Sequence, residues 1–259
     1  MAEQGKIDPM HQFTVEPLVP LKVGPYDLSF TNSSLWLLIT LVLIYGFMAM
    51  GMRRELVPGR WQMAVESLTG FIENMVQVNI GPEGRKFVPY IFSLFSFILV
   101  ANLLGLFPLA IIPGLHQFTT TSHFSITGVL AVMSFGLVLL IGFWRHGLHF
   151  FSLFMPAGLP LIGKIVLFPI EFISFMVRPF SLALRLFVAM IAGHILMEVF
   201  GSFIVNGLNG GALGWGIGAL SFVFIVGVAA LELLVCAIQA YVFALLTTLY
   251  LNDAINLHH

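Results

Sequence analysis

One long stretch of the sequence carries no charged side chain, and it limits the possible folds more than any other feature. Between Phe87 and Trp144 there is no Asp, Glu, Lys or Arg. In the whole chain of 259 residues only 9% are charged, whereas a soluble domain has about 25%. So few charges cannot cover a water-facing surface. The composition therefore predicts an integral membrane protein whose surface faces mostly lipid.

Three apolar stretches have the length of a membrane-spanning helix, which needs about 20 residues. The first has its core at Leu35–Met50, and the others are expected at about residues 88–107 and 125–144. A proline-containing loop with four hydroxyl side chains, Thr119–Ser122, separates the second stretch from the third. We expect these three helices to stand upright in the membrane.

Residues 60–79 have a different pattern, because their apolar side chains recur at intervals of three and four residues. The apolar stripe comprises Trp61, Ala64, Val65, Leu68, Phe71, Ile72, Met75 and Val76. The polar positions between them are Arg60, Gln62, Glu66, Glu73 and Gln77. This pattern predicts an amphipathic helix that lies in the membrane interface or against a partner. Packing on the chain's own spans is the alternative.

The cationic residues near the ends of the predicted spans indicate the orientation. If the spans alternate, all of these fall on one side: Arg53, Arg54, Arg60, Arg85, Lys86 and Arg145. That side is the cytoplasm, or the matrix in a mitochondrion. We therefore expect a non-cytoplasmic N-terminus and a cytoplasmic C-terminus. Residues 1–30 have no compact apolar run, so they are expected to form an irregular polar arm and not a signal peptide.

Two further apolar segments, about residues 162–206 and 213–253, are joined by a turn rich in glycine and asparagine. A helix of that length extends about 60 Å, twice the hydrocarbon core. It cannot stand upright, so we expect a long tilted helical hairpin. The predicted fold is an all-α membrane domain over residues 1–259, divided into the arm (1–30), the spans with the amphipathic helix (31–160) and the hairpin (161–259).

Polar and ionisable side chains recur inside both hairpin segments. In the first segment, four ionisable residues lie at intervals of seven, and they follow one slowly drifting stripe because seven residues make two helical turns less about 20°. The four are Lys164, Glu171, Arg178 and Arg185. The first segment also carries Ser174, Ser181, His194 and Glu198, and the second segment carries Glu232, Gln239, Tyr250 and Asp253. An ionisable group in the bilayer interior costs at least about 2.5–3.5 kcal/mol, which makes each one a functional-site hypothesis. The alternative is a structural ion pair, and it has most weight near the predicted cytoplasmic end.

Antiparallel pairing of the two segments brings residues to the same depth when their numbers have a nearly constant sum. One such register aligns polar partners at four depths. The pairs are Arg185 with Gln239, Glu171 with Asp253, His194 with Glu232, and Arg178 with Tyr250.

Small residues in the same segments would allow another helix to approach closely. They follow Arg185 at Ala189, Ala192 and Gly193, and they form a ridge at Cys236, Ala240 and Ala244. A partner protein is one explanation, and packing between the two hairpin helices is the other for the second ridge. The single cysteine, Cys236, is expected to be a packing residue.

Arg185 divides the polar residues into two groups. His194 and Glu232 lie toward the non-cytoplasmic side and can exchange protons, since histidine titrates near neutrality. Arginine does not deprotonate in proteins, so Arg185 cannot relay a proton. A fixed positive charge between two polar half-paths would block leakage and attract a carboxylate. The chain shows no mobile carrier, which implies a partner with a membrane carboxyl group.

Three motifs carry a resemblance to a known family. They are Pro179–Phe187 with Ala192-Gly193-His194; Gln239–Phe243 with Leu246-Thr247 and Tyr250-Leu251; and Asn102–Pro108. In these motifs, and over nearly its whole length, the chain resembles subunit a of the F-type ATP synthases, in the alphaproteobacterial and mitochondrial versions.

The resemblance implies a role for the polar residues. Arg185 would be the stator arginine that faces the carboxylates of a rotor ring of c subunits, with Gln239 opposite it. One half-channel, on the non-cytoplasmic side, would contain His194 and Glu232, and the cytoplasmic one would contain Ser181 and Tyr250. The full set expected along the proton path is Arg185, Gln239, Glu232, His194, Glu198, Glu171, Arg178, Ser181, Tyr250 and Asp253.

The resemblance also implies the partners of the chain, its lack of catalytic activity and the membrane in which it lies. The partners would be the c-subunit ring, the b subunits of a peripheral stalk, the rest of the ATP synthase and membrane lipid. The chain itself would be non-catalytic, without cofactor, metal or nucleic acid, in a bacterial inner membrane or, alternatively, a mitochondrial one. Some relatives have an asparagine where this chain has Ala189, and in some the acid and the histidine at His194 and Glu232 are exchanged.

Other functions fit parts of the sequence. A proton-coupled secondary transporter could use Arg185 for an anionic substrate, but that class often has paired halves with broken helices, and no such repeat is found. An intramembrane hydrolase would need a motif such as H-E-x-x-H or G-x-S-x-G, and neither occurs. A purely structural scaffold would not need stacked polar pairs.

Overall fold

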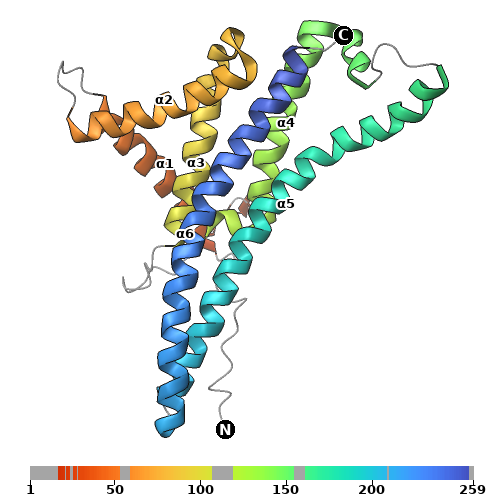
Figure 1. Cartoon of the computed structure of the whole chain (residues 1–259). Helices are drawn as coiled ribbons and strands as arrows, with labels where there is room; N and C mark the ends of the chain where they lie inside the picture. Colours follow the sequence, from red (N-terminus) through yellow and green to blue (C-terminus); the bar gives the residue numbers. More distant parts are fainter. Residues whose placement is uncertain are drawn as a thin grey trace. The chain divides into compact units, whose positions relative to one another are not determined.

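The computed structural model describes residues 17–20, 22–23, 26–27, 29–52, 59–106, 119–154, 161–208 and 210–256. Its α-helices are α1 (Asn32–Gly51), α2 (Arg60–Ile80), α3 (Val88–Leu106), α4 (Phe124–His146), α5 (Leu161–Leu208) and α6 (Gly211–Ile255) (Figure 1). Short 3-10 helices are η2 (Pro82–Phe87), η4 (Thr120–Ser122) and η5 (Gly147–Phe154).

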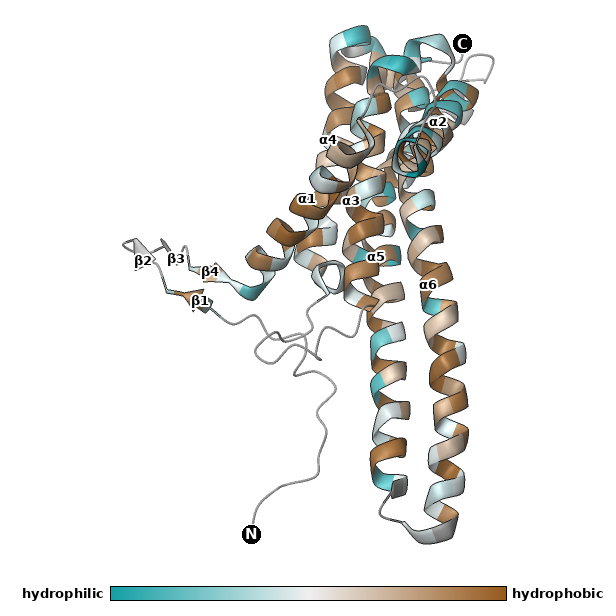
Figure 2. Cartoon of the chain, turned by 90° about the vertical axis from the view of Figure 1, so that its left-hand side faces the viewer, coloured by the Kyte–Doolittle hydropathy of each residue, from teal (hydrophilic) through white to brown (hydrophobic). Residues whose placement is uncertain are grey.

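Among the described residues, five helical segments are long and apolar enough to cross a membrane: Asn32–Gly51, Pro82–Leu106, Phe124–His146, Ile165–Gly207 and Leu213–Ile255. Figure 2 shows these helices mostly in the hydrophobic colour, whereas hydrophilic residues gather on α2. The chain is therefore an all-α membrane protein, and this prediction is confirmed, including the two unusually long final helices. Helices satisfy most of their backbone N–H and C=O groups internally, as a hydrocarbon environment requires, although Pro169 and Pro179 inside α5 have no N–H group to donate.

The expected polar arm of residues 1–30 lies largely outside the described residues. Its described part contains short strands where an irregular segment was expected: β1 (Pro17–Val19), β2 (Lys22–Val23), β3 (Tyr26–Asp27) and β4 (Phe30–Thr31). β1 pairs with β4 and β2 with β3, both antiparallel. Arg53, Arg54, most of the loop after α3 and the stretch before Pro160 also fall outside the described residues.

The chain divides into two compact units, and α1, α3, α5 and α6 contribute residues to both. The first unit comprises the described residues within 1–43, 99–123 and 187–238, and the second comprises those within 44–98, 124–186 and 239–259. Each unit has its own buried residues and its own polar groups, and each is described separately below.

Within the second unit, α2 packs against the chain's own helices. Ile72 and Val76 are completely buried. The Phe71 ring lies 6.2 Å from the Phe95 ring of α3 and 5.7 Å from the Tyr241 ring of α6. The structure thus shows that α2 packs on the chain's own helices, and its position in the membrane interface stays a prediction. One position was assigned to the wrong face: Gln62 is buried, and its Nε2 donates to Glu66 Oε1 at 2.8 Å.

An aromatic cluster, which the sequence did not predict, holds α5 in the second unit. Phe175 of α5 is buried, and its ring centroid lies 5.0 Å from that of Phe135 on α4. Phe150 and Phe154 of η5 approach the same ring to 6.1 and 5.4 Å. Tilted and edge-on rings at these distances are favourable. The turn of α5 that follows, with Arg178, is positioned by this packing.

In the first unit, glycines bring the two hairpin helices together at the turn. Gly211 has a φ of 67°, a conformation that favours glycine because it carries no Cβ. A Cβ on Gly214 would overlap the carbonyl oxygen of Gly207, so the two backbones touch there. Further along, the rings of Phe200 and Phe224 stack with centroids 5.3 Å apart. The hairpin register is therefore set by backbone contact at the turn.

The small ridge on α6 is buried within the chain. Cys236, Ala240 and Ala244 are all fully inaccessible. Packing inside the chain therefore accounts for this ridge, and a partner helix is not needed to explain it.

The packing of α2 predicts a difference in stability between two matched substitutions. Ile72→Ala should lower the free energy of unfolding by about 2–5 kcal/mol, because it removes three carbons from a closed core position. Val78→Ala, on the exposed face of the same helix, should change it by less than about 0.5 kcal/mol. Reversible unfolding of the purified chain in mixed micelles measures both. Equal effects would contradict packing of α2 on the chain's own helices.

Candidate functional site

The most deeply buried ionisable pair lies in the first unit. His194 on α5 and Glu232 on α6 are 3% and 2% exposed, and Nε2 of the histidine lies 3.8 Å from Oε1 of the glutamate. The predicted register for this pair is confirmed. Among the described residues, neither carboxyl oxygen of Glu232 has a hydrogen-bond partner.

Gly193 makes room for the Glu232 carboxyl group. A Cβ at this position would lie 2.6 Å from Oε1 and 2.7 Å from Cδ of Glu232. Any larger residue would therefore push the carboxyl group away from His194. Glu198, one turn further along α5 and also expected on the path, is half-buried.

Sequence reasoning missed several buried polar residues of the first unit, one of which contacts this pair. Thr119 was assigned to a loop, yet its Oγ1 lies 2.7 Å from Nε2 of His194, and both side chains are buried. Asn102 and Thr121 are completely buried, and their side-chain polar atoms have no partner among the described residues. The available signal was four consecutive hydroxyl residues, Thr119–Ser122, between two apolar spans.

Arg178 is the centre of a polar cluster in the second unit. Its Nη1 donates to Oδ2 of Asp253 at 2.8 Å, and its guanidinium lies 4.9 Å from the Tyr250 ring and 5.3 Å from the Phe175 ring. A guanidinium stacked on aromatic rings and paired with a carboxylate is well satisfied. The predicted alignment of Arg178 with Tyr250 is confirmed.

The predicted alignment of Glu171 with Asp253 is wrong, because Asp253 has a different partner. Asp253 pairs with Arg178, which is seven residues further along α5. The physical reason is charge: Glu171 and Asp253 would repel each other, whereas the long arginine side chain reaches the aspartate one turn beyond Tyr250. Glu171 is half-buried and has no hydrogen bond or ion pair to another described residue.

Arg185 points away from the packed face of α5. Its neighbours Leu182 and Leu186 are buried, but the arginine and Ser181 are exposed. No carboxylate in the described part of the chain lies within ion-pair distance of it. Gln239 is half-buried, and its position opposite Arg185 stays a prediction.

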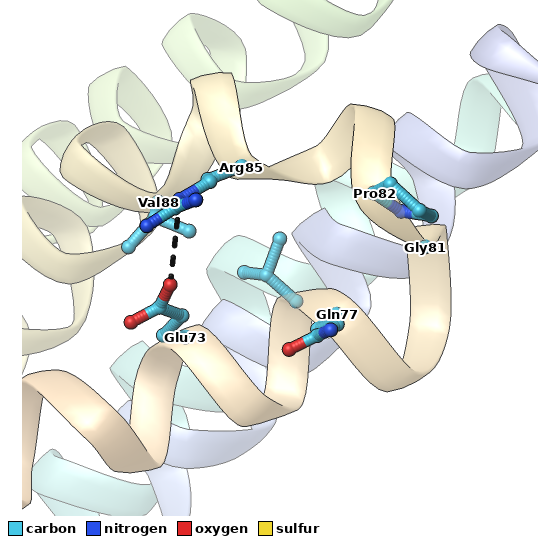
Figure 3. A pocket seen from close by; sticks show the side chains of 7 residues that line it. Glu73, Gln77, Gly81, Pro82, Arg85 and Val88 are labelled. Atoms are coloured by element: carbon cyan, nitrogen blue, oxygen red, sulfur yellow. Dashed lines mark ion pairs between the residues drawn. The ribbon is translucent and has the colours of Figure 1, made fainter.

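A pocket at the corner between α2 and η2 contains none of the predicted path residues. Figure 3 shows Glu73, Gln77, Arg85 and Val88 around it. Its volume is about 260 Å³, and an ion pair of 3.6 Å between Arg85 and Glu73 crosses one side. The Arg85 side chain is largely exposed and that of Glu73 is partly exposed, so this corner has the character of a solvated surface.

These features define a class: a multi-pass α-helical membrane protein with ionisable groups inside its longest helices. The ATP synthase A chain family matches residues 34–252. The ATP synthase subunit a of Novosphingobium aromaticivorans is 61% identical over 262 residues, covering 100% of both chains. Those of Rhizorhabdus wittichii and Mesorhizobium japonicum are 60% and 48% identical, covering 99% and 98% of each chain. The chain belongs to the ATP synthase A chain family.

The cluster around Arg178 predicts energetic coupling between two charges. Arg178→Gln and Asp253→Asn should each destabilise the chain, and a double-mutant cycle should give a coupling of about 0.5–1 kcal/mol, since both side chains are partly exposed. The exchange Arg178→Asp with Asp253→Arg should recover part of the loss. Unfolding in mixed micelles measures the cycle, and additive effects of the two single substitutions would argue against the ion pair.

Proposed function

We propose that the chain is the proton-translocating stator subunit of an F-type ATP synthase. Two offset half-channels pass protons to and from the carboxylates of a rotating ring of c subunits, and Arg185 separates them. The observation that carries this proposal is the exposed position of Arg185 in the middle of α5, next to buried Leu182 and Leu186 and without a carboxylate within ion-pair distance among the described residues. The names of the relatives support the same complex.

Exposure of Arg185 requires a partner in the membrane. Burying an unpaired charge against hydrocarbon costs at least about 2.5–3.5 kcal/mol. A carboxylate on a neighbouring protein removes this cost through a charge-assisted hydrogen bond. The guanidinium keeps its proton, so it can hold a carboxylate in the ionised form but cannot pass a proton on. Each ring carboxylate must therefore exchange its proton before and after it passes Arg185.

The non-cytoplasmic half-channel is the buried group of His194, Glu232 and Glu198. Histidine and glutamate are both able to take up and release a proton in this environment. At 3.8 Å the histidine nitrogen and the glutamate oxygen are slightly beyond hydrogen-bond distance, so a small side-chain rotation or one water molecule completes the transfer. The absence of a side chain on Gly193 leaves the place that the Glu232 carboxyl group occupies beside His194.

The cytoplasmic half-channel is the group of Ser181, Glu171 and Tyr250, with Arg178 and Asp253 at its outer end. Ser181 lies one turn before Arg185 on the same face of α5, and both are exposed. The guanidinium of Arg178 lies 4.9 Å from the Tyr250 ring, so the two side chains are in contact at this end of the path. Gln239 lies at the depth of Arg185 and completes the polar surface between the two half-channels.

In this proposal the chain is a non-catalytic part of the enzyme. Both compact units act as a single membrane domain, with the N-terminus outside the cytoplasm and the C-terminus inside, in the bacterial inner membrane. The partners are the c-subunit ring and the b subunits of the peripheral stalk. Membership of the ATP synthase A chain family favours this function over the secondary transporter that the sequence left open.

Removal of the central charge tests the proposal directly. Arg185→Ala should abolish ATP-driven proton pumping, because nothing then separates the half-channels or releases the proton from the ring carboxylate. The measurement is acidification of proteoliposomes that contain the whole ATP synthase. Arg85→Ala, which removes an exposed arginine elsewhere in the second unit, is the matched control and should pump normally. Normal coupled pumping by the Arg185→Ala variant would contradict the proposed function.

Removal of the buried carboxyl group tests the non-cytoplasmic half-channel. Glu232→Leu should slow proton transport at least about 100-fold, the scale expected for loss of a proton-transfer group, while the complex stays assembled. Passive proton flux through the membrane sector and native gel electrophoresis measure the two effects. Glu66→Leu, on the exposed surface of α2, serves as the control. Unchanged flux in Glu232→Leu would remove this residue from the path.

A further inference from the structure

Thr119 is buried at the start of η4 and contacts His194 over a separation of 75 residues in the chain. The distance of 2.7 Å between its Oγ1 and Nε2 of the histidine is that of a strong hydrogen bond. The same nitrogen faces Oε1 of Glu232 at 3.8 Å. Thr119 and Glu232 therefore lie around one ring nitrogen of His194, and the threonine is the nearer of the two.

The neighbouring helix is shaped to accommodate this hydroxyl group. A Cβ on Gly105 of α3 would lie 2.5 Å from both Oγ1 and Cγ2 of Thr119. The glycine thus leaves the space that the threonine side chain occupies. Asn102 lies three residues earlier and so on the same face of α3. It is completely buried, and its amide group has no partner among the described residues.

A hydroxyl group is a suitable hydrogen-bond partner for a ring nitrogen, such as Nε2 of His194, that is protonated and deprotonated in turn. It can donate to a neutral imidazole nitrogen, and it can accept from the same nitrogen once that nitrogen carries a proton. The hydrogen bond therefore survives both protonation states, so the ring keeps its orientation toward Glu232 while its charge changes. An amide or a carboxyl group at this place would favour one state over the other.

We propose that Thr119 is a positioning residue of the non-cytoplasmic half-channel, which holds Nε2 of His194 toward Glu232 in both protonation states. Gly105 contributes to this positioning, because its lack of a side chain leaves room for the threonine side chain. This inference rests on the proposed function and adds η4 and α3 to the two hairpin helices as walls of the half-channel.

The hydroxyl group can be removed with little change in shape. Thr119→Val should lower ATP-driven proton pumping by the reconstituted ATP synthase about 3- to 10-fold, the scale of one lost hydrogen bond. Thr119→Ser keeps the hydroxyl group and should restore at least half of the wild-type rate. Equal loss in both variants, or normal pumping by Thr119→Val, would overturn the proposal.

A substitution at Gly105 that displaces the Thr119 side chain, while Thr119 itself is unchanged, gives an independent test. Gly105→Ala should reduce pumping to a similar extent, because the new methyl group occupies the place of Oγ1. Gly136→Ala on α4, where a Cβ would meet nothing within 4 Å, is the control and should pump normally. Normal pumping by Gly105→Ala would contradict the role given to the glycine.

Solid-state nuclear magnetic resonance of the histidine-labelled complex separates positioning from general stability. The Nε2 signal of His194 should be single in the wild type and in Thr119→Ser, and it should split or shift in Thr119→Val. An unchanged signal in Thr119→Val would overturn the positioning role. If Arg185→Ala abolishes pumping while the Thr119 variants behave as wild type, this inference fails and the proposed function stands.

Discussion

The cost of placing polar groups in hydrocarbon governs this structure. The backbone meets it by forming helices, in which every interior N–H and C=O group is satisfied. Ionisable side chains have no such general solution, and each needs a specific partner. Arg178 finds a carboxylate and two aromatic rings within the chain, and His194 finds Thr119 and Glu232. Arg185 has no carboxylate within ion-pair distance among the described residues, and this is why we propose that its partner lies on another protein.

The helices could be predicted from sequence because their signals are local. The ends of α1, α3 and α4 follow from apolar length, and α5 and α6 extend beyond any upright span. The pairing of His194 with Glu232 could also be predicted from the sequence, since a hairpin register depends only on the position of its turn. The same argument placed Glu171 beside Asp253, because depth alone ignores the sign of the charges and the reach of an arginine side chain.

What could not be predicted depends on contacts between segments far apart in the chain. Thr119 is 75 residues from His194, and nothing in its own neighbourhood distinguishes it from Thr120 or Thr121. The aromatic cluster at Phe175 joins α4, α5 and η5, and the last of these had no sequence signal. The amphipathic pattern of α2 fitted both a lipid interface and a protein surface, and the pattern alone could not predict that Phe71 contacts Phe95 and Tyr241.

The burial of Cys236 has a practical consequence for labelling. It is the single cysteine of the sequence, and its thiol group is completely enclosed on α6. A water-soluble thiol reagent therefore meets no native target in the folded protein. A cysteine introduced at any other position would be the sole reactive thiol, and its rate of modification would report the access of water to that position alone. The natural sequence is thus already a background for mapping aqueous access, residue by residue, along both long helices.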